Sequence, residues 1–153
     1  MSEESARIQI LIIDDHAVVR RGLMMVLVLQ PDLAVVGETG TASSGVHMAA
    51  ELRPDVILLD LTLPDQDGDA AVAELRAASP ESRILILSGV QDTGRIRAAI
   101  AAGIDGYVPK EVNPGELARA IRQVAANQSY IHPDVLHQLS FTSQPPATPP
   151  ANL

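Results

Sequence analysis

The sequence predicts an α/β fold, a doubly wound sheet of five parallel strands in the order 2-1-3-4-5. Two observations lead to this prediction. Apolar runs alternate with segments of helical spacing five times along the chain, which is typical of a parallel sheet covered by helices on both faces. The first run, IQILII, ends at a charged pair, as expected of a strand that is buried on both faces.

The five strands are expected at residues 8–13, 33–38, 56–60, 83–88 and 105–108. Apolar residues at helical spacing from Val19 to Leu27 indicate the first helix, which the segment QPD ends. Three further helices are expected at 43–53, 70–78 and 96–102. Pro54 ends the first of these three, and Gly103 is the expected C-terminal stop of the last.

The fifth helix has the clearest start, in the segment NPGEL. Asn113 is the expected N-cap, Pro114 takes the first helical position, and Glu116 stands where a capping box requires it. The buried stripe of this helix then follows at helical spacing, through Leu117, Ile121 and Val124.

Length and composition exclude several classes of protein. The 153 residues suffice for one domain with a core, and 46% of them are hydrophobic and 20% charged, as in an ordinary globular protein. A net charge of −8 argues against nucleic-acid binding by this chain alone. Without cysteine there are no disulfides or thiolate metal sites. The polar N-terminus is no signal peptide, and no apolar run is long enough to span a membrane, so a cytoplasmic location is expected.

We expect one domain over residues 1–128 and a linker or tail over 129–153. The segment HPDVLHQL could form a last helical turn or two, and the uncharged, proline-rich segment after about residue 141 is typical of an extended linker. Such a linker could lead to a second domain outside this chain. A native disordered end is the alternative.

Chemically active side chains gather at the predicted ends of four strands. These residues are Asp14 and Asp15, Asp60, Ser88, and Lys110. Ligands of doubly wound sheets bind at the carboxyl ends of the strands, where the winding reverses. Each residue alone has an ordinary explanation as a cap, turn former or solvated charge, but their joint position on this edge favours a site.

The residue types indicate phosphoryl transfer at this site. Three carboxylates within a few ångströms repel one another unless a cation intervenes. An all-oxygen donor set suits Mg²⁺, with Mn²⁺ also possible. Ser88 and Lys110 could then reach phosphoryl oxygens, and Asp60, central in the sheet, is the natural nucleophile for an acyl phosphate. Lys110 is the single lysine among eleven basic residues, and a compact ammonium differs in shape from the planar fork of arginine.

Residues 7–127 resemble the receiver domains of two-component response regulators. The resemblance is carried by IIDDH at 12–16, DLTLPDQDG at 60–68, SG at 88–89 and GYVPK at 106–110, in this order. The segment SYIHPDVLHQL at 129–139 is similar to the one that follows the receiver in the subfamily with a C-terminal LuxR-type helix-turn-helix. The resemblance implies a flavodoxin-like (βα)5 fold and an output domain outside this chain, through which alone DNA would be bound.

The resemblance also implies roles for individual residues. Asp60 would accept a phosphoryl group from a sensor histidine kinase. Asp14, Asp15, Asp60 and the backbone carbonyl of Thr62 would hold the metal ion. Ser88 and Lys110 would bind the phosphoryl oxygens, and Tyr107 would be the aromatic residue that turns inward on activation.

One feature departs from the family pattern. Pro109 precedes Lys110, whereas many receivers have a proline after the lysine, often with a cis bond. A cis 110–111 peptide would here form without proline, at a cost of about 3 kcal/mol or more.

Residues 23–29 of the first helix are apolar without a break. Such a helix is usually buried within its own domain. The alternative is a homodimer interface through the first helix, the fifth helix, or both. The four histidines give no metal set in the sequence, and His16 is expected in the first turn of the first helix.

The leading interpretation is the receiver of a transcriptional response regulator, which catalyses only its own phosphorylation and dephosphorylation. A stand-alone receiver for phosphorelay or control of a protein partner is the first alternative. A Mg²⁺-dependent phosphatase is the second, although the sequence offers no second acid for a leaving group.

Overall fold

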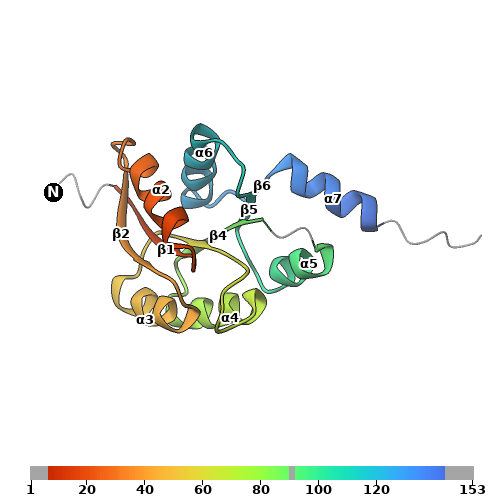
Figure 1. Ribbon diagram of the computed structural model, residues 1–153, viewed down its shortest axis with the longest axis horizontal. Helices are drawn as coiled ribbons and strands as arrows, with labels where there is room; N and C mark the ends of the chain where they lie inside the picture. The colour runs from red at the N-terminus through yellow and green to blue at the C-terminus, as the bar shows by residue number, and fades with distance from the viewer. Residues whose placement is uncertain (1–6, 90–91, 144–153) are drawn as a thin grey trace, which may run out of the picture.

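The computed structural model describes residues 7–89 and 92–143 (Figure 1). The predicted proline-rich tail lies largely outside the described residues, which end at 143. The strands are β1 (Ile8–Ile13), β2 (Leu33–Thr39), β3 (Val56–Leu59), β4 (Arg83–Ser88), β5 (Gly106–Pro109) and β6 (Tyr130–Ile131). The helices are α2 (Ala17–Leu27), α3 (Ala42–Leu52), α4 (Gly68–Ala78), α5 (Thr93–Ala101), α6 (Pro114–Ala125) and α7 (Pro133–Ser143).

The strands form one parallel sheet in the order β2-β1-β3-β4-β5-β6. This confirms the α/β class and the predicted order of the first five strands. The count of five strands is wrong, because a sixth, two-residue strand pairs with β5. Its backbone pairing continues where the His132 amide donates to the Tyr107 carbonyl, at 2.9 Å.

Helices cover both faces of the sheet, as Figure 1 shows. Side chains alternate between the faces along each strand. Leu11 and Ile13 of β1 join the core cluster under α3, α4 and α5, whereas Ile10 and Ile12 join the one under α2 and α6. Each strand of the centre is therefore apolar on both sides, which explains the uninterrupted apolar runs of the sequence.

The helix termini follow the local signals of the sequence. The Asn113 side chain accepts a hydrogen bond from the Glu116 amide at 2.8 Å, and Pro114 opens α6. Gly103 follows α5 with a φ of 99°, in the left-handed region that glycine adopts without a steric cost. Both sequence predictions are confirmed.

The segment after residue 128 is more ordered than a linker with a helical turn or two. The helix α7 runs for 11 residues and packs on α5 and β5. Its Val135 is buried in the same cluster as Tyr107, and Arg97 of α5 donates to the Leu139 carbonyl at 3.2 Å. The sequence predicted only a turn or two of helix here; the greater length of α7 was missed, because its packing on β5 and α5 involves segments distant in the sequence. Across the described residues, no helix is long and apolar enough to cross a membrane.

Candidate functional site

The sequence-predicted site residues meet at the carboxyl ends of the parallel strands. Asp14 follows β1, Asp60 follows β3, Ser88 ends β4, and Lys110 follows β5. Backbone hydrogen bonds tie these loops to the neighbouring strands: the Asp60 amide donates to the Ile13 carbonyl at 3.0 Å, and the Lys110 amide to the Ser88 carbonyl at 3.2 Å. The side chains are therefore positioned by the sheet register.

Lys110 bridges two buried carboxylates. Its Nζ lies 3.0 Å from Asp14 Oδ2 and 3.2 Å from Asp60 Oδ2, and both aspartates are 2% exposed. Burial alone would lower the pKa of Lys110, but hydrogen bonds and charge from Asp14 and Asp60 raise it above the ordinary value. The lysine therefore stays protonated and supplies the cation that this pair of carboxylates requires.

Thr62 contacts both carboxylate oxygens of Asp60. Its hydroxyl donates to Asp60 Oδ2 at 3.0 Å, and its amide lies 3.3 Å from Asp60 Oδ1. Oδ2 thus receives both Thr62 and Lys110, while Oδ1 holds one long contact to a backbone amide. The metal-binding role of the Thr62 carbonyl stays a prediction.

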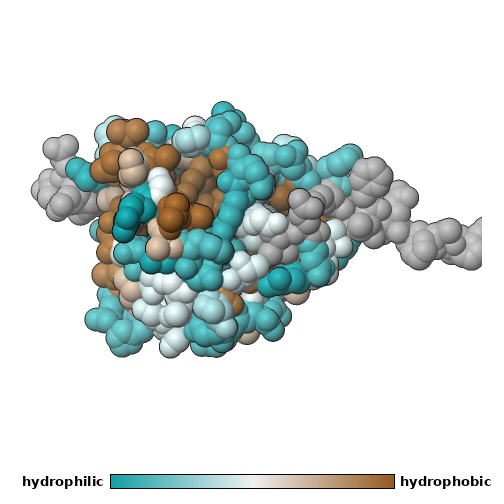
Figure 2. All heavy atoms as spheres, in the orientation of Figure 1, coloured by the Kyte–Doolittle hydropathy of each residue, from teal (hydrophilic) through white to brown (hydrophobic). Residues whose placement is uncertain are grey.

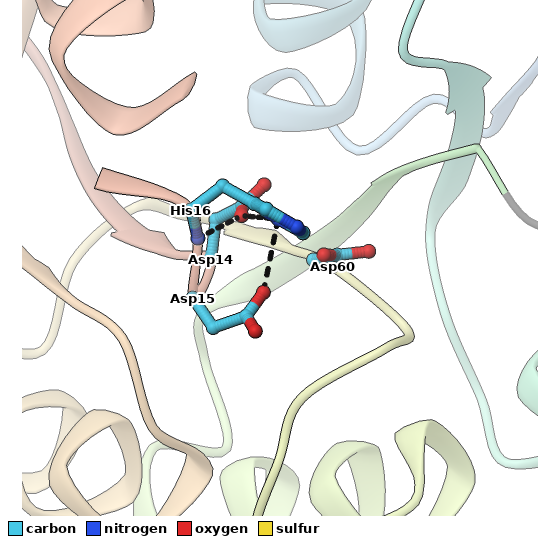
Figure 3. Close-up of side chains that lie close together, drawn as sticks. All are labelled: Asp14, Asp15, His16 and Asp60. Atoms are coloured by element: carbon cyan, nitrogen blue, oxygen red, sulfur yellow. Dashed lines mark hydrogen bonds and ion pairs between the residues drawn. The ribbon is translucent and has the colours of Figure 1, made fainter. Parts of the chain in front are cut away.

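Asp15 and His16 complete the acidic end of the site (Figure 3). Ligand atoms of Asp14, Asp15, His16 and Asp60 all lie within 4.8 Å of one another. His16 Nδ1 is 3.1 Å from Asp14 Oδ1 and 3.0 Å from Asp15 Oδ1. Figure 3 shows Asp14, Asp15 and Asp60 around a common space, with the imidazole beside them.

The donor set fits the expected hard divalent cation. Three carboxylates offer oxygen atoms at the ends of two adjacent strands, and Mg²⁺ is usually held by one or two carboxylates while it keeps several waters. The close approach of these carboxylates, with Lys110 serving Asp14 and Asp60, leaves negative charge at Asp15 for a cation to balance.

Ser88 and Tyr107 lie deeper on the same edge. Ser88 is 1% exposed and Tyr107 is also 1% exposed. Burial raises the pKa of Tyr107 to about 12, with the neighbouring Ser88 hydroxyl acting in the opposite direction. The tyrosine ring thus already points inward in the described conformation, beneath β6 and α7.

The expected cis 110–111 peptide is wrong, since no peptide bond in the described part of the chain is cis. The bond is trans, as the intrinsic preference of a non-proline peptide dictates.

Sequence reasoning missed three basic groups around the site. His16 turns to the aspartates, Arg20 donates to the Asp14 carbonyl, and Arg95 donates to the Leu61 carbonyl at 2.9 Å. The position of His16 directly after two aspartates was a usable signal. No short-range pattern marks the two arginines, because the fold brings them to the site.

The family model of the response regulator receiver domain matches residues 10–122. The chain belongs to this family. Regulators of the family receive their signals from histidine kinases, work by phosphorylation and generally bind Mg²⁺ at an acidic pocket. In this receiver, Asp14, Asp15 and Asp60 form an acidic cluster of that kind.

Among curated relatives, the DNA-binding transcriptional activator DevR/DosR of Mycobacterium tuberculosis is 40% identical over 124 residues, which are 81% of this chain and 57% of the relative. The response regulator protein VraR of Staphylococcus aureus is 34% identical over 84% of this chain and 62% of its own length. The chain therefore spans less than two thirds of these relatives.

Solved structures show the same fold. A LuxR-family two-component response regulator from Aurantimonas has a TM-score of 0.82 and 32% identity, covering 88% of this chain and 96% of that one. The signal receiver domain of the putative response regulator NarL from Mycobacterium tuberculosis has a TM-score of 0.76 and 26% identity, with 80% and 98% covered.

Proposed function

We propose that Asp60 of this receiver accepts a phosphoryl group from a sensor histidine kinase and thereby controls a transcriptional output domain. The observation that carries the proposal is the buried Asp60 carboxylate, paired with Lys110 at 3.2 Å on the edge that also holds Asp14 and Asp15. Relatives named as transcriptional activators or regulatory proteins support the output.

Phosphorylation would begin with attack of an Asp60 oxygen on the phosphorus of a phosphohistidine. An oxygen–phosphorus bond forms, the phosphorus–nitrogen bond breaks, and the histidine leaves with the bonding electron pair and takes up a proton. Oδ1 is the better-placed nucleophile because Oδ2 already receives Lys110 and Thr62. A bound Mg²⁺, held by Asp14, Asp15, Asp60 and the Thr62 carbonyl, would neutralise charge on the phosphoryl oxygens.

Lys110 and Ser88 would hold the product. The ammonium lies between Asp14 and Asp60 and needs a small movement to meet a phosphoryl oxygen on Asp60. The Ser88 hydroxyl would donate a second hydrogen bond. Tyr107 would act as the switch residue, and because its ring already points inward, the proposed activation stabilises this conformation. If the ring kept the same distribution of rotamers with and without beryllofluoride, its role as a switch would be disproved.

The receiver unit would extend to residue 128, with the segment after it linking to the output domain. In the described residues β6 and α7 dock this segment on β5 and α5. A chain of this kind would work in the cytoplasm and catalyse only its own phosphorylation and dephosphorylation.

The first test is the intact mass of the protein after incubation with Mg²⁺ and acetyl phosphate. The expected result is the gain of one phosphoryl group, which Asp60→Asn abolishes and which the removal of Mg²⁺ prevents. Asp69→Asn is the matched control, since it removes an exposed carboxylate from the first turn of α4 and should be phosphorylated normally. If Asp60→Asn gained the same mass as the parent protein, the phosphoryl acceptor would be another residue and the proposal would be wrong.

A second copy of the chain would bind at α2. The alternative in which this helix is fully covered by its own domain is wrong: Val18 and Met25 of α2 are 85% and 67% exposed. Val28 and Leu29, which follow the helix directly, are 75% and 76% exposed. Apolar atoms gather over the α2 region in Figure 2. A groove of about 290 Å³ runs from α2 to α6, lined by Leu23, Val26 and Leu117 among others.

Sedimentation velocity over a range of concentrations tests this dimer. Leu29→Asp should abolish association, because it places a charge in the apolar contact. Leu136→Asp is the control, since Leu136 is an exposed apolar residue of α7, away from α2. A monomer at every concentration, with and without beryllofluoride, would refute the interface.

A further inference from the structure

Arg95 connects helix α5 to the peptide group that directly follows Asp60. Its Nη2 donates to the Leu61 carbonyl at 2.9 Å, across 34 residues of sequence. Arg95 lies in the first turn of α5, which the Asp92 side chain caps. Because helical side chains lean towards the N-terminus of their helix, the guanidinium extends towards the edge of the sheet that carries the site. Figure 1 shows α5 beside α4, and Leu61 lies in the loop that leads into α4.

The hydrogen bond of Arg95 and a contact of Asp60 lie at opposite ends of one peptide group. The Leu61 carbonyl and the Thr62 amide belong to the same trans peptide, in which the C=O and N–H bonds point in opposite directions. Arg95 holds the oxygen end, and the N–H end lies 3.3 Å from Asp60 Oδ1. The guanidinium therefore limits rotation of this peptide and keeps the Thr62 amide directed at Asp60.

The loop that contains Leu61 is also held by contacts that do not involve Arg95. Leu61 is 1% exposed, and a side chain at Gly68 would collide with it. Thr62 and Asp67 form an isolated antiparallel bridge. Leu61 and Arg95 line a cavity of about 370 Å³ between α4 and α5, which is large enough for water to replace the guanidinium at the carbonyl. We therefore expect Arg95 to matter more for the orientation of the peptide than for the stability of the fold.

The Thr62 amide lies where a phosphoryl group on Asp60 would need a hydrogen-bond donor. Oδ1 is the Asp60 oxygen proposed above to bond to phosphorus, and the amide is 3.3 Å from it. In phosphoryl transfer, negative charge spreads over the equatorial phosphoryl oxygens, and donors that are already oriented stabilise this charge without reorganisation. A guanidinium bound to the carbonyl also polarises the peptide and strengthens its N–H as a donor.

We propose that Arg95 is a positioning residue for phosphoryl transfer to Asp60 and acts through the Leu61–Thr62 peptide. The proposal rests on the function proposed above. With acetyl phosphate as the donor, a bond forms between Asp60 Oδ1 and phosphorus. The bond between phosphorus and the acetate oxygen breaks, and acetate leaves as an anion with the electron pair. Throughout this step Arg95 holds the Leu61 carbonyl, so that the Thr62 amide stays directed at the phosphoryl oxygens.

Two other roles of Arg95 make different predictions. As a surface charge, it would attract an anionic donor to the cavity, whose lining includes Asp67, Asp69 and Asp92. Its loss would then raise the half-saturating concentration of acetyl phosphate, and high salt would remove the difference. As a structural link, it would stabilise the fold, and its loss would reduce stability and Mg²⁺ affinity together. Loss of a positioning residue instead lowers the rate constant at saturating donor and Mg²⁺.

The test follows phosphorylation of the full chain by intact mass, with saturating Mg²⁺ and a range of acetyl phosphate concentrations. Arg95→Gln should lower the saturating rate constant by about five- to tenfold, less than the roughly hundredfold loss that follows removal of a whole donor. Arg95→Lys keeps a cationic donor and should recover part of the rate. Arg97→Gln is the matched control, because it removes the same charge from the same helix and a hydrogen bond to a different carbonyl, that of Leu139 in α7. It should react at the parent rate.

The NMR resonance of the Thr62 amide gives an independent readout of its orientation. Beryllofluoride with Mg²⁺ should shift this resonance strongly in the parent protein and in Arg97→Gln, and much less in Arg95→Gln. The urea midpoint and the Mg²⁺ affinity of Arg95→Gln should stay close to those of the parent protein.

The two proposals fail in different ways. If the parent protein gains no phosphoryl group, or Asp60→Asn gains it equally, the proposed function is wrong and the role of Arg95 falls with it. If Asp60 is phosphorylated but Arg95→Gln reacts at the parent rate, or no more slowly than Arg97→Gln, only the positioning role is wrong. A deficit that high salt removes, or that comes with matching losses of stability and Mg²⁺ affinity, would likewise overturn that role.

Discussion

The helices α2 and α6 cover the same face of the sheet but differ in how many of their residues are buried. α6 buries five residues, namely Leu117, Ala118, Ala120, Ile121 and Val124, and it begins with a side-chain cap. α2 buries one described residue, Leu27, and has no side-chain cap. Its exposed apolar residues include Val18 and Met25, and Val28 and Leu29 follow directly after it.

The difference shows which of the two helices leaves apolar surface that its own domain does not cover. The core takes up most of the apolar residues of α6, so this helix lacks the exposed apolar surface that α2 has. α2 keeps an apolar surface that its own domain does not cover, and continuous patches of this kind mark interaction sites on soluble proteins. Stability within the domain should therefore depend on α6 far more than on the outer face of α2.

The largest effect is expected from truncation of the α6 core. Ile121 is fully buried among residues of the strands and of α6. Ile121→Ala should lower the free energy of unfolding by about 2–5 kcal/mol, because it removes buried methyl groups and leaves a cavity. Urea denaturation of the purified protein measures the change. If Ile121→Ala lowered the free energy of unfolding by less than an alanine substitution at an exposed position of α2 does, the proposed difference between the two helices would be wrong.

A good part of this fold could be predicted from the sequence, because its signals are local. Buried strands give uninterrupted apolar runs, and Asn113 and Gly103 mark helix ends through their own backbone chemistry. The strand order then places Asp14 and Asp60 at the carboxyl ends of adjacent strands. Lys110 follows β5, two strands from β3 on the same edge, and its long side chain reaches both carboxylates.

The remaining features depend on contacts between distant segments. β6 has two residues, too few for any pattern, and forms because β5 offers an unpaired edge. The docking of α7 depends on Val135 reaching the cluster of Tyr107. For α2 the sequence left two interpretations open, burial within the domain and self-association. The exposed side chains of Val18 and Met25 exclude the first, and no local sequence pattern reports such exposure. The turn of His16 towards Asp15 likewise follows from side-chain geometry.

A moderate effect is expected from the ion pair that joins α6 to the turn after α2. Arg122 of α6 donates to Asp32 at 2.7 and 3.0 Å, and to Gln30 at 2.7 Å, both in the turn that follows α2. The hydrogen bond from Arg122 is the main cause that lowers the pKa of Asp32 below 3.8. The stabilisation is therefore present at neutral pH and is lost as the pH falls through the lowered pKa.

Asp32→Asn should thus lower the free energy of unfolding at neutral pH by at most about 1 kcal/mol, because the pair is exposed to solvent and screened. Below the lowered pKa the variant and the parent protein should have equal stability. Urea midpoints at neutral and acidic pH measure this. A difference that persists unchanged in acid would mean that the carboxylate charge is not its cause.

The smallest effect on stability is expected at the outer face of α2. Met25 is 67% exposed, and Met25→Gln keeps its length and helix propensity while removing apolar character. The free energy of unfolding of the monomer should change by less than about 0.5 kcal/mol, measured at a concentration below that of association. Leu27→Ala, the buried neighbour in the same helix, should cost about 2–5 kcal/mol. If the two substitutions destabilise the monomer equally, the outer face of α2 is needed for folding, and its exposed apolar residues would no longer point to a partner.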